Sequence, residues 1–168
     1  MRSAAVTVTR FAPDQWPVYR ALRLASLQDA PGAFGATFGE QAHWPDLLWQ
    51  MRLDAGVASS AACPLLAQCD GVPAGITWGK VEADGVHVYQ VWVAQAWRGR
   101  GVAQALLAAV IAWARSQGAR AVHLGVALTA TAATRLYLRA GFVPNGQPTI
   151  LRNGTTLLSQ PMHLLLPP

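Results

Sequence analysis

The second half of the chain contains no acidic residue. All eight Asp and Glu residues of the 168-residue sequence lie at or before Asp84. Residues 1–84 also contain six basic residues and so have a net charge of −2. Residues 85–168 contain seven arginines and have a net charge of +7. A strongly basic half attracts polyanions such as nucleic acids. The arginines are scattered, however, there is no lysine run, and no single element interleaves arginine with aromatic residues, so no nucleic-acid partner is expected.

Cysteine is scarce as well. The two cysteines, Cys63 and Cys69, fall in one expected strand region with no second pair nearby. Disulfide frameworks and cysteine-based metal sites use more cysteines at defined spacings. The sequence therefore predicts two buried free thiols, with no disulfide and no metal site.

Long apolar runs are absent too. No run reaches the ~20 residues of a membrane span, and the first residues, MRSAAVTVTRF, lack the apolar core of a secretion signal. We therefore expect no membrane partner and a cytoplasmic location. With 52% hydrophobic and 12% charged residues, the sequence is typical of one globular domain over residues 1–168, and so apolar a surface favours a homodimer.

The most informative stretch is residues 86–118. It contains a strand rich in β-branched and aromatic residues, then the turn RGRG, then an apolar helix that Gly118 ends. Gly99 and Gly101 let the backbone turn tightly, so N–H groups can point outward at the positive end of the helix. Arg98 and Arg100 add charged donors. This arrangement predicts a phosphate-binding turn.

The turn lacks the features of two common nucleotide-binding motifs. A P-loop ends in Gly-Lys-Ser/Thr, which is missing here. A dinucleotide-binding fold needs Gly or Ala at the sixth position of its glycine motif, where this chain has Gln104. It also needs an acidic residue further along, and none follows Asp84. Neither kind of fold is expected.

Two motifs lie one helix and one strand apart in the chain. The first is Arg98-Gly99-Arg100-Gly101-Val102-Ala103, and the second is LYLRAGF at residues 136–142. Together they resemble the Gln/Arg-x-x-Gly-x-Gly/Ala and Leu-Tyr-x-x-x-Gly-Phe motifs of the GNAT superfamily of N-acetyltransferases, a resemblance that extends over residues 64–142. It implies an α/β fold of the α+β kind: a mixed, mostly antiparallel sheet of six to seven strands, flanked by about four helices and splayed between the fourth and fifth strands.

Periodicity and turn residues predict the other elements. Asp14 is expected to cap the first helix, and Thr129 or Thr131 a later one. Asn153-Gly154 predicts a hairpin, and Pro161 a bulge or a sheet edge. The expected strands are 6–10, 64–69, 72–81, 86–93, 121–127, 150–151, 155–158 and 162–166; the expected helices are 14–29, 46–54, 102 up to the stop at 118, and 131–139, with a loop at 55–62.

The resemblance implies acetyl-CoA as co-substrate, held mainly by the protein backbone. The main chain of Val91, Trp92 and Val93 would bond the pantetheine arm, and an N–H of that strand would stabilise the oxyanion. The turn from Arg98 to Ala103 would bind the pyrophosphate, and coenzyme A is then the polyanion that the basic half meets. One departure concerns Ala130, which stands where the family often has an Asn that touches the cofactor, with Thr129 or Thr131 as substitutes.

The resemblance also assigns the proton transfers. Tyr137 matches the family tyrosine that protonates the departing thiolate, and a phenol is neutral at pH 7, so it can donate. Where many members have a glutamate base near the start of the central strand, this chain has His87. An imidazole with a pKa near ~6.5 is a competent base. An ordinary surface or core role for His87 stays equally open, with Glu40, Glu82 and Asp84 as fallback bases; His123 is expected to be a packing residue.

The acceptor is a small-molecule or protein amine. In the superfamily the first two helices and their connection usually line its pocket, which points to Phe34, Phe38, Glu40 and Trp44. An alternative function is a non-catalytic acyl-CoA-binding or regulatory domain of the same fold. Tyr137 favours catalysis, whereas the missing glutamate and Ala130 favour the alternative.

Overall fold

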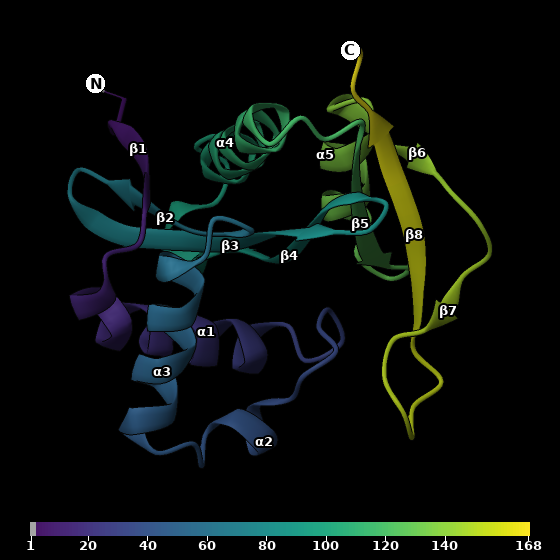
Figure 1. Ribbon diagram of the computed structural model, residues 1–168. Helices are drawn as coiled ribbons and strands as arrows, with labels where there is room; N and C mark the ends of the chain where they lie inside the picture. The colour runs from purple at the N-terminus through teal and green to yellow at the C-terminus, as the bar shows by residue number, and fades with distance from the viewer. Residues whose placement is uncertain (1–2) are drawn as a thin grey trace.

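The centre of the fold is a sheet of eight strands in the order β1-β2-β3-β4-β5-β8-β6, with β7 paired to the edge of β8 (Figure 1). The computed structural model describes residues 3–168. Every neighbouring pair is antiparallel except β4 and β5, which are parallel. The strands are β1 (Val6–Arg10), β2 (Ala62–Cys69), β3 (Val72–Glu82), β4 (Gly85–Val93), β5 (Ala121–Ala127), β6 (Val143–Pro144), β7 (Thr149–Ile150) and β8 (Leu158–Leu165). The mixed, mostly antiparallel sheet that the resemblance implies is confirmed. The short strand β7 corresponds to the strand expected at 150–151, one residue earlier in the chain.

Helices cover both faces of the sheet. In Figure 1, α4 lies against one face of strands β1–β4, whereas α1 and α3 lie against the other face. Each face therefore has its own hydrophobic cluster, one built around α4 and the other around Tyr19, Trp49 and Ile76. The helices are α1 (Trp16–Asp29), α2 (Phe38–Gln41), α3 (Asp46–Ala58), α4 (Val102–Ser116) and α5 (Thr131–Arg139), with single 3₁₀ turns at Pro13–Gln15 and Gln95–Trp97.

Helix α4 is the most enclosed helix because its sequence is apolar on nearly every face. Leu106, Leu107 and Val110 have almost no exposed surface. Burying side chains of this kind stabilises a fold by about 1.5–3 kcal/mol each. Gly101 precedes the first helical residue with φ +79°, and Gly118 follows the helix with φ +71°. These are the glycine turns that the sequence predicted at both ends.

Several boundaries differ from the sequence-based prediction. Helix α1 begins at Trp16, because residues 13–15 form a 3₁₀ turn instead of an Asp14-capped helical start. Helix α3 continues beyond residue 54 into the loop expected at 55–62 and ends at Ala58. Its last residues, AGVA, are small and carry no helix-breaking proline, and the helix is supported by packing against β2. Ala130, and neither flanking threonine, is the N-cap of α5.

The C-terminal hairpin is wider than Asn153-Gly154 predicts. Strand β7 pairs Thr149 with Ser159 and Ile150 with Leu158, so residues 151–157 form the connection and the strand expected at 155–158 starts only at its last residue. Thr155 forms turn bonds with Arg152 and Leu157 instead of ladder bonds. A hydroxyl that bonds nearby backbone in this way competes with strand pairing.

Pro161 lies within β8, opposite Gly125 of β5. The carbonyl of Pro161 accepts a 2.9 Å hydrogen bond from the Asn145 N–H, so it faces away from β5. Its ring nitrogen faces the same way, into the gap between the two short strands β6 and β7. The prediction of a bulge or a sheet edge at Pro161 is therefore wrong, because β8 has neighbours on both sides and its register with β5 is unbroken; the proline is tolerated because its nitrogen faces this gap.

Two further expectations are tested by the structure. Cys63 and Cys69 are buried free thiols, as predicted. Within residues 3–168, no helix combines the length and the apolar character that crossing a bilayer requires.

Replacing Gly85 by Ala is expected to destabilise the fold by about 2–4 kcal/mol. Gly85 opens β4 with φ +142°, and a Cβ there would lie 2.4 Å from the carbonyl oxygen of Ala121 at the start of β5. Urea unfolding followed by circular dichroism measures the loss. Gly118→Ala is the control, since φ there is +71° but no atom lies within 4 Å, and it should cost about 1 kcal/mol. Equal losses would contradict the close approach.

Candidate active site

The site begins where β4 and β5 separate. The two parallel strands pair only at Val86 with Val122 and at His87 with His123. Beyond these pairs they border a cavity of about 810 Å³, lined by residues 88–91 of β4 and residues 124–127 of β5. The splay that the resemblance implied between the fourth and fifth strands is therefore present, and the β5-facing edge of β4 has no strand partner along the cavity.

A bulge shapes the cavity side of β4. Gln90 has φ +59°, and the β3–β4 register shifts so that Ile76 faces Trp92 while Trp78 faces Tyr89. The Gln90 side chain accepts a 3.0 Å hydrogen bond from the Tyr19 hydroxyl. A bulge kinks a strand and interrupts its ladder, so backbone groups of β4 become available at the cavity.

The glycine turn before α4 is open to solvent. No atom lies within 4 Å of the positions that a Cβ would take on Gly99 or Gly101. Among residues 3–168, no backbone carbonyl accepts from the N–H groups of Val102, Ala103 or Gln104, the first turn of α4. Free N–H groups at a helix start bind anions. The turn thus has free N–H groups and open space, and phosphate binding there stays a prediction.

Side chains around this turn are tied to helix α1 through Asp29. The Asp29 carboxylate accepts a 2.9 Å hydrogen bond from the Trp92 indole and forms an ion pair with Arg98, whose Nε also donates to the Val93 carbonyl at 3.0 Å. Hydrogen bonds from Trp92 and Arg98 lower the pKa of Asp29 below its usual value. Arg100 is exposed and lies over the Trp97 ring at 5.2 Å. Arg98 therefore braces the turn, and Arg100 is the less constrained of the two arginines.

Tyr137 lines the cavity from α5. Its side chain is only 6% exposed and packs edge-on against Phe142, with ring centroids 6.0 Å apart. Burial raises the pKa of the Tyr137 phenol to about 12. The phenol is therefore neutral across the physiological range and keeps a proton to donate. Of the residues predicted to contact the cofactor, Val91 and Tyr137 line this cavity, whereas Trp92, Val93 and residues 98–103 do not.

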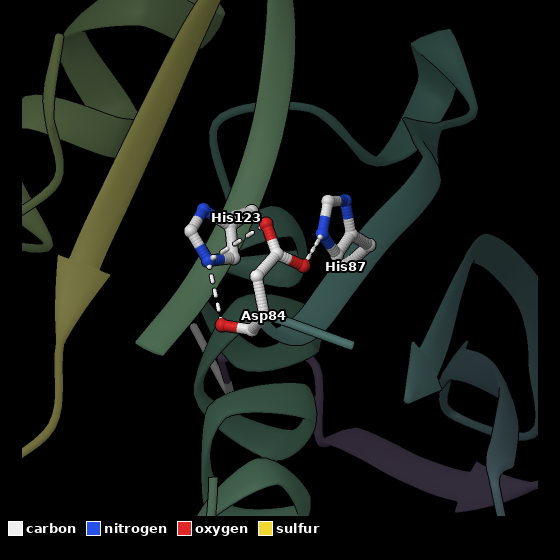
Figure 2. A group of neighbouring side chains, drawn as sticks. All are labelled: Asp84, His87 and His123. Atoms are coloured by element: carbon white, nitrogen blue, oxygen red, sulfur yellow. Dashed lines mark hydrogen bonds and ion pairs between the residues drawn. The ribbon is translucent and has the colours of Figure 1, made fainter. Parts of the chain in front are cut away.

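His87 belongs to a cluster at the point where β4 and β5 still pair (Figure 2). Its Nε2 lies 2.7 Å from Oδ1 of Asp84, and its ring stacks on that of His123 with centroids 4.8 Å apart. His123 Nε2 lies 3.1 Å from the Asp84 carbonyl oxygen and 3.6 Å from Oδ2. The hydrogen bond from His87 lowers the pKa of Asp84. His123 thus packs against the ring of His87, as expected, and it also belongs to the polar cluster around Asp84.

This cluster lies beside the cavity without lining it. Tyr89 and Lys80 do line it, and both share a sheet face with His87, since Tyr89 is two residues along and Lys80 is directly opposite. The Tyr89 hydroxyl donates to Glu82 at 2.6 Å. Burial, and then this hydrogen bond, raise the pKa of Tyr89. The ligand atoms of Asp84, His87 and His123 lie within 4.8 Å of one another, a spacing that also suits a metal ion and that the sequence did not suggest.

Only one of the four residues expected to line the acceptor pocket borders the cavity. Phe34 lines the cavity, but Phe38, Glu40 and Trp44 do not. Glu40 instead caps α2 by accepting from the Thr37 N–H at 3.0 Å, and Trp44 packs against Trp49. Ala130 also lines the cavity.

The sequence missed other cavity residues, above all Arg23, Arg52 and Gln90. An arginine on a helix is ordinarily read as solvated, and a bulge leaves no local signature, so no pattern identified these three positions in advance.

Comparisons with known proteins agree with this geometry. The model of the acetyltransferase (GNAT) family matches residues 22–142. No curated protein matches the chain. An acetyltransferase of the GNAT family from Streptococcus pneumoniae is similar with a TM-score of 0.78 at 20% identity, over 96% of this chain and 100% of that one.

Two other similar structures contain ligands. YncA from Salmonella typhimurium, solved with acetyl-CoA, has a TM-score of 0.80 at 19% identity, over 97% of this chain and 95% of that one. Spermidine N-acetyltransferase from Vibrio cholerae, solved with CoA and spermine, has a TM-score of 0.78 at 14% identity, over 95% of each chain. The family match spans most of the sequence, so this chain belongs to the GNAT family of acetyltransferases.

The raised pKa of Tyr137 predicts a pH dependence of stability. The unfolded chain loses the phenol proton near pH 10, whereas the folded chain keeps it to about pH 12. The free energy of unfolding should therefore fall as the pH rises from 10 to 12, because the unfolded state releases its proton first. Urea unfolding at pH 8 and pH 11 measures the fall, which should be smaller in Tyr137→Phe. An identical fall in both proteins would contradict the buried, protonated phenol.

Proposed function

We propose that this protein transfers an acetyl group from acetyl-CoA to a primary amine, by direct attack of the amine on the thioester. The observation that carries the proposal is the buried, neutral phenol of Tyr137, which lines the cavity where β4 and β5 separate. Family membership and the acetyl-CoA and CoA held by the proteins from Salmonella typhimurium and Vibrio cholerae support coenzyme A as co-substrate.

The donor would be held mainly by main-chain groups. The pantetheine arm would bond the open edge of β4 at residues 91–93, since β5 has already separated from that edge. Trp92 and Val93 would act through their backbone, because both side chains are buried and the Trp92 indole is bonded to Asp29. An N–H of this strand would stabilise the oxyanion, a contribution of the order of 3 kcal/mol.

The pyrophosphate would lie on the glycine turn. The free N–H groups of Val102 and Ala103 at the start of α4, with those of Gly99 and Gly101, provide the donors. Arg98 would hold the turn in shape through Asp29, and the exposed Arg100 would add its charge. The backbone supplies most of this site, so it depends on glycine conformation more than on any single side chain.

The chemical step would proceed through a tetrahedral intermediate. The neutral amine attacks the thioester carbonyl carbon, and a C–N bond forms as the oxygen takes the negative charge. The C–S bond then breaks, and the thiolate takes a proton from the phenol of Tyr137. The amine nitrogen gives its extra proton to a base, so the products are the acetamide and the free thiol of coenzyme A.

His87 is the base that we propose. Asp84 accepts a hydrogen bond from its Nε2, which fixes the orientation of the ring. The ring lies next to Tyr89 and opposite Lys80, both of which line the cavity. A proton would therefore pass from the amine to His87 along the cavity edge, through a water molecule.

A second function, acyl-CoA binding without catalysis, is favoured by one observation. Ala130 lines the cavity as the N-cap of α5 and offers no side-chain donor to the pantetheine arm. The two functions differ in thiol release. A non-catalytic domain would bind coenzyme A and release no thiol from acetyl-CoA with any amine of a broad panel.

Tyr137→Phe is expected to lower kcat by about 10²-fold, since the thiolate then leaves without a proton donor. Thiol release from acetyl-CoA measures kcat, and calorimetry should give a coenzyme A affinity unchanged within about twofold.

The acetyl thioester of an acidic aryl thiol is the matched control substrate, because its thiolate is stable enough to leave without taking a proton. The variant and the parent should use this substrate at equal rates. A loss of equal size with both thioesters would indicate a structural defect and contradict the acid role of Tyr137.

His87→Gln is expected to lower kcat by about 10²-fold, because the amide can still bond Asp84 but cannot take a proton. Added imidazole should restore part of the rate by serving as the missing base. His43→Gln, which changes an exposed residue away from the cavity, is the control and should behave as the parent protein. Unchanged turnover in His87→Gln, or a loss that imidazole does not reduce, would exclude His87 as the base.

A further inference from the structure

The cavity has a strongly positive lining. Three cationic side chains border it, those of Arg23, Arg52 and Lys80, and no Asp or Glu is among its lining residues. None of the three forms an ion pair with any acidic group of residues 3–168. Glu82 accepts from the Tyr89 hydroxyl beside the cavity but does not line it. Three positive charges thus face a shared space without a counter-ion.

Arg23 is the least expected of these residues. It projects from the middle of α1 and is only 4% exposed. Its Nε donates to the Gln41 side chain at 3.2 Å, but its Nη1 is buried with no hydrogen-bond partner in the described chain. A buried guanidinium without a counter-ion is costly, and so is an unused buried donor. Such a group is ordinarily retained because something else satisfies it.

Arg52 brings a second guanidinium from α3. It lies over the Trp44 ring at 5.3 Å, and Arg23 lies over the Phe34 ring at 5.0 Å. Burial lowers the pKa of Arg23, and the nearby positive charge of Arg52 lowers it further. Two guanidiniums on different helices, each steadied by an aromatic ring, form a preorganised receptor for an oxyanion, which guanidinium groups bind in a bidentate manner.

We propose that the acceptor is a small primary amine that also carries a carboxylate or another oxyanion, which Arg23 and Arg52 bind. This inference rests on the proposed acetyl transfer and names the class of its acceptor. The aromatic side chains of Phe34, Trp78 and Tyr89 line the same cavity and suit an apolar or aromatic body between the two polar ends. A polyamine would add positive charge to a cavity that already has three cations, so acceptors of that kind are disfavoured.

A kinetic panel tests the charge requirement. Phenylalanine, its phosphonate analogue, phenylalaninamide, phenethylamine and spermidine are compared by thiol release from acetyl-CoA. The anionic amines should have kcat/KM at least about 10-fold above the neutral amide. The amine of phenylalaninamide is deprotonated more readily than that of phenylalanine, so without an oxyanion site the amide should react faster. The carboxylate and phosphonate arms distinguish which oxyanion fits. A kcat/KM for phenylalaninamide or spermidine that equals or exceeds that for the anionic amines would overturn the proposal.

The variant Arg52→Gln tests whether Arg23 and Arg52 cause the preference for anionic amines. The variant should lose about 10-fold or more in kcat/KM for phenylalanine while its value for phenylalaninamide stays close to that of the parent. Arg52 is exposed on α3, so the substitution should not unfold the chain, whereas Arg23→Gln changes a buried residue and is tested second. Arg20→Gln is the matched control, since Arg20 is on the same helix as Arg23 but does not line the cavity. A parallel loss with both amines would contradict the role of Arg52.

A binding measurement separates this inference from the proposed reaction. With coenzyme A present, N-acetylphenylalanine should raise Tm more than N-acetylphenylalaninamide, and Arg52→Gln should remove the difference. If no amine releases thiol but this difference is present, the acetyl transfer fails and the oxyanion site stands. If amines are acetylated but the two acetyl compounds give equal shifts, the oxyanion site is wrong and the transferase stands.

Discussion

The whole site depends on the short contact between β4 and β5. Two residue pairs join these strands, and Gly85 brings their first residues close enough that the Ala121 carbonyl fills the space of a side chain. After that contact the strands separate, since the bulge at Gln90 turns β4 while β5 continues beside β8. The opening thus combines an unpaired backbone edge with a cavity, and the proposed reaction needs both in order to bring a thioester arm and an amine together.

The distribution of charge in the fold differs from its distribution in the sequence. The second half of the chain carries the excess of arginine, and this predicted a polyanion partner for that half. Yet the three cations at the cavity, Arg23, Arg52 and Lys80, all come from the first half, whose net charge is negative. The acids of that half are used elsewhere: Asp29 braces Arg98, and Asp84 bonds His87. The charge distribution of the sequence therefore gave no information on which cations line the cavity, and the polyanion partner of the basic half stays a prediction.

Elements with strong local signals were predictable. The bounds of β1 and β5 match the prediction, since β-branched residues or turn glycines and prolines mark them, and α4 begins at the glycine turn. The end of α3 and the start of β8 were wrong, because packing and a Thr155 turn decided them. Tyr137 could be identified from its motif. The neighbours of His87 could not, because His123 is brought beside it by strand order, and nothing in the local sequence encodes that order.

The proline in β8 limits how the sheet can associate with other chains. Half of the residues of β8 are paired on its outer side, by two strands of only two residues each, so the rim of the sheet is thin there. At the gap between them the backbone has an acceptor, which Asn145 already uses, and no N–H at all, because Pro161 supplies none. A strand from a neighbouring molecule would find no donor at this point with which to start a ladder. The rim is thereby protected against edge-to-edge aggregation by one ring of three methylene groups.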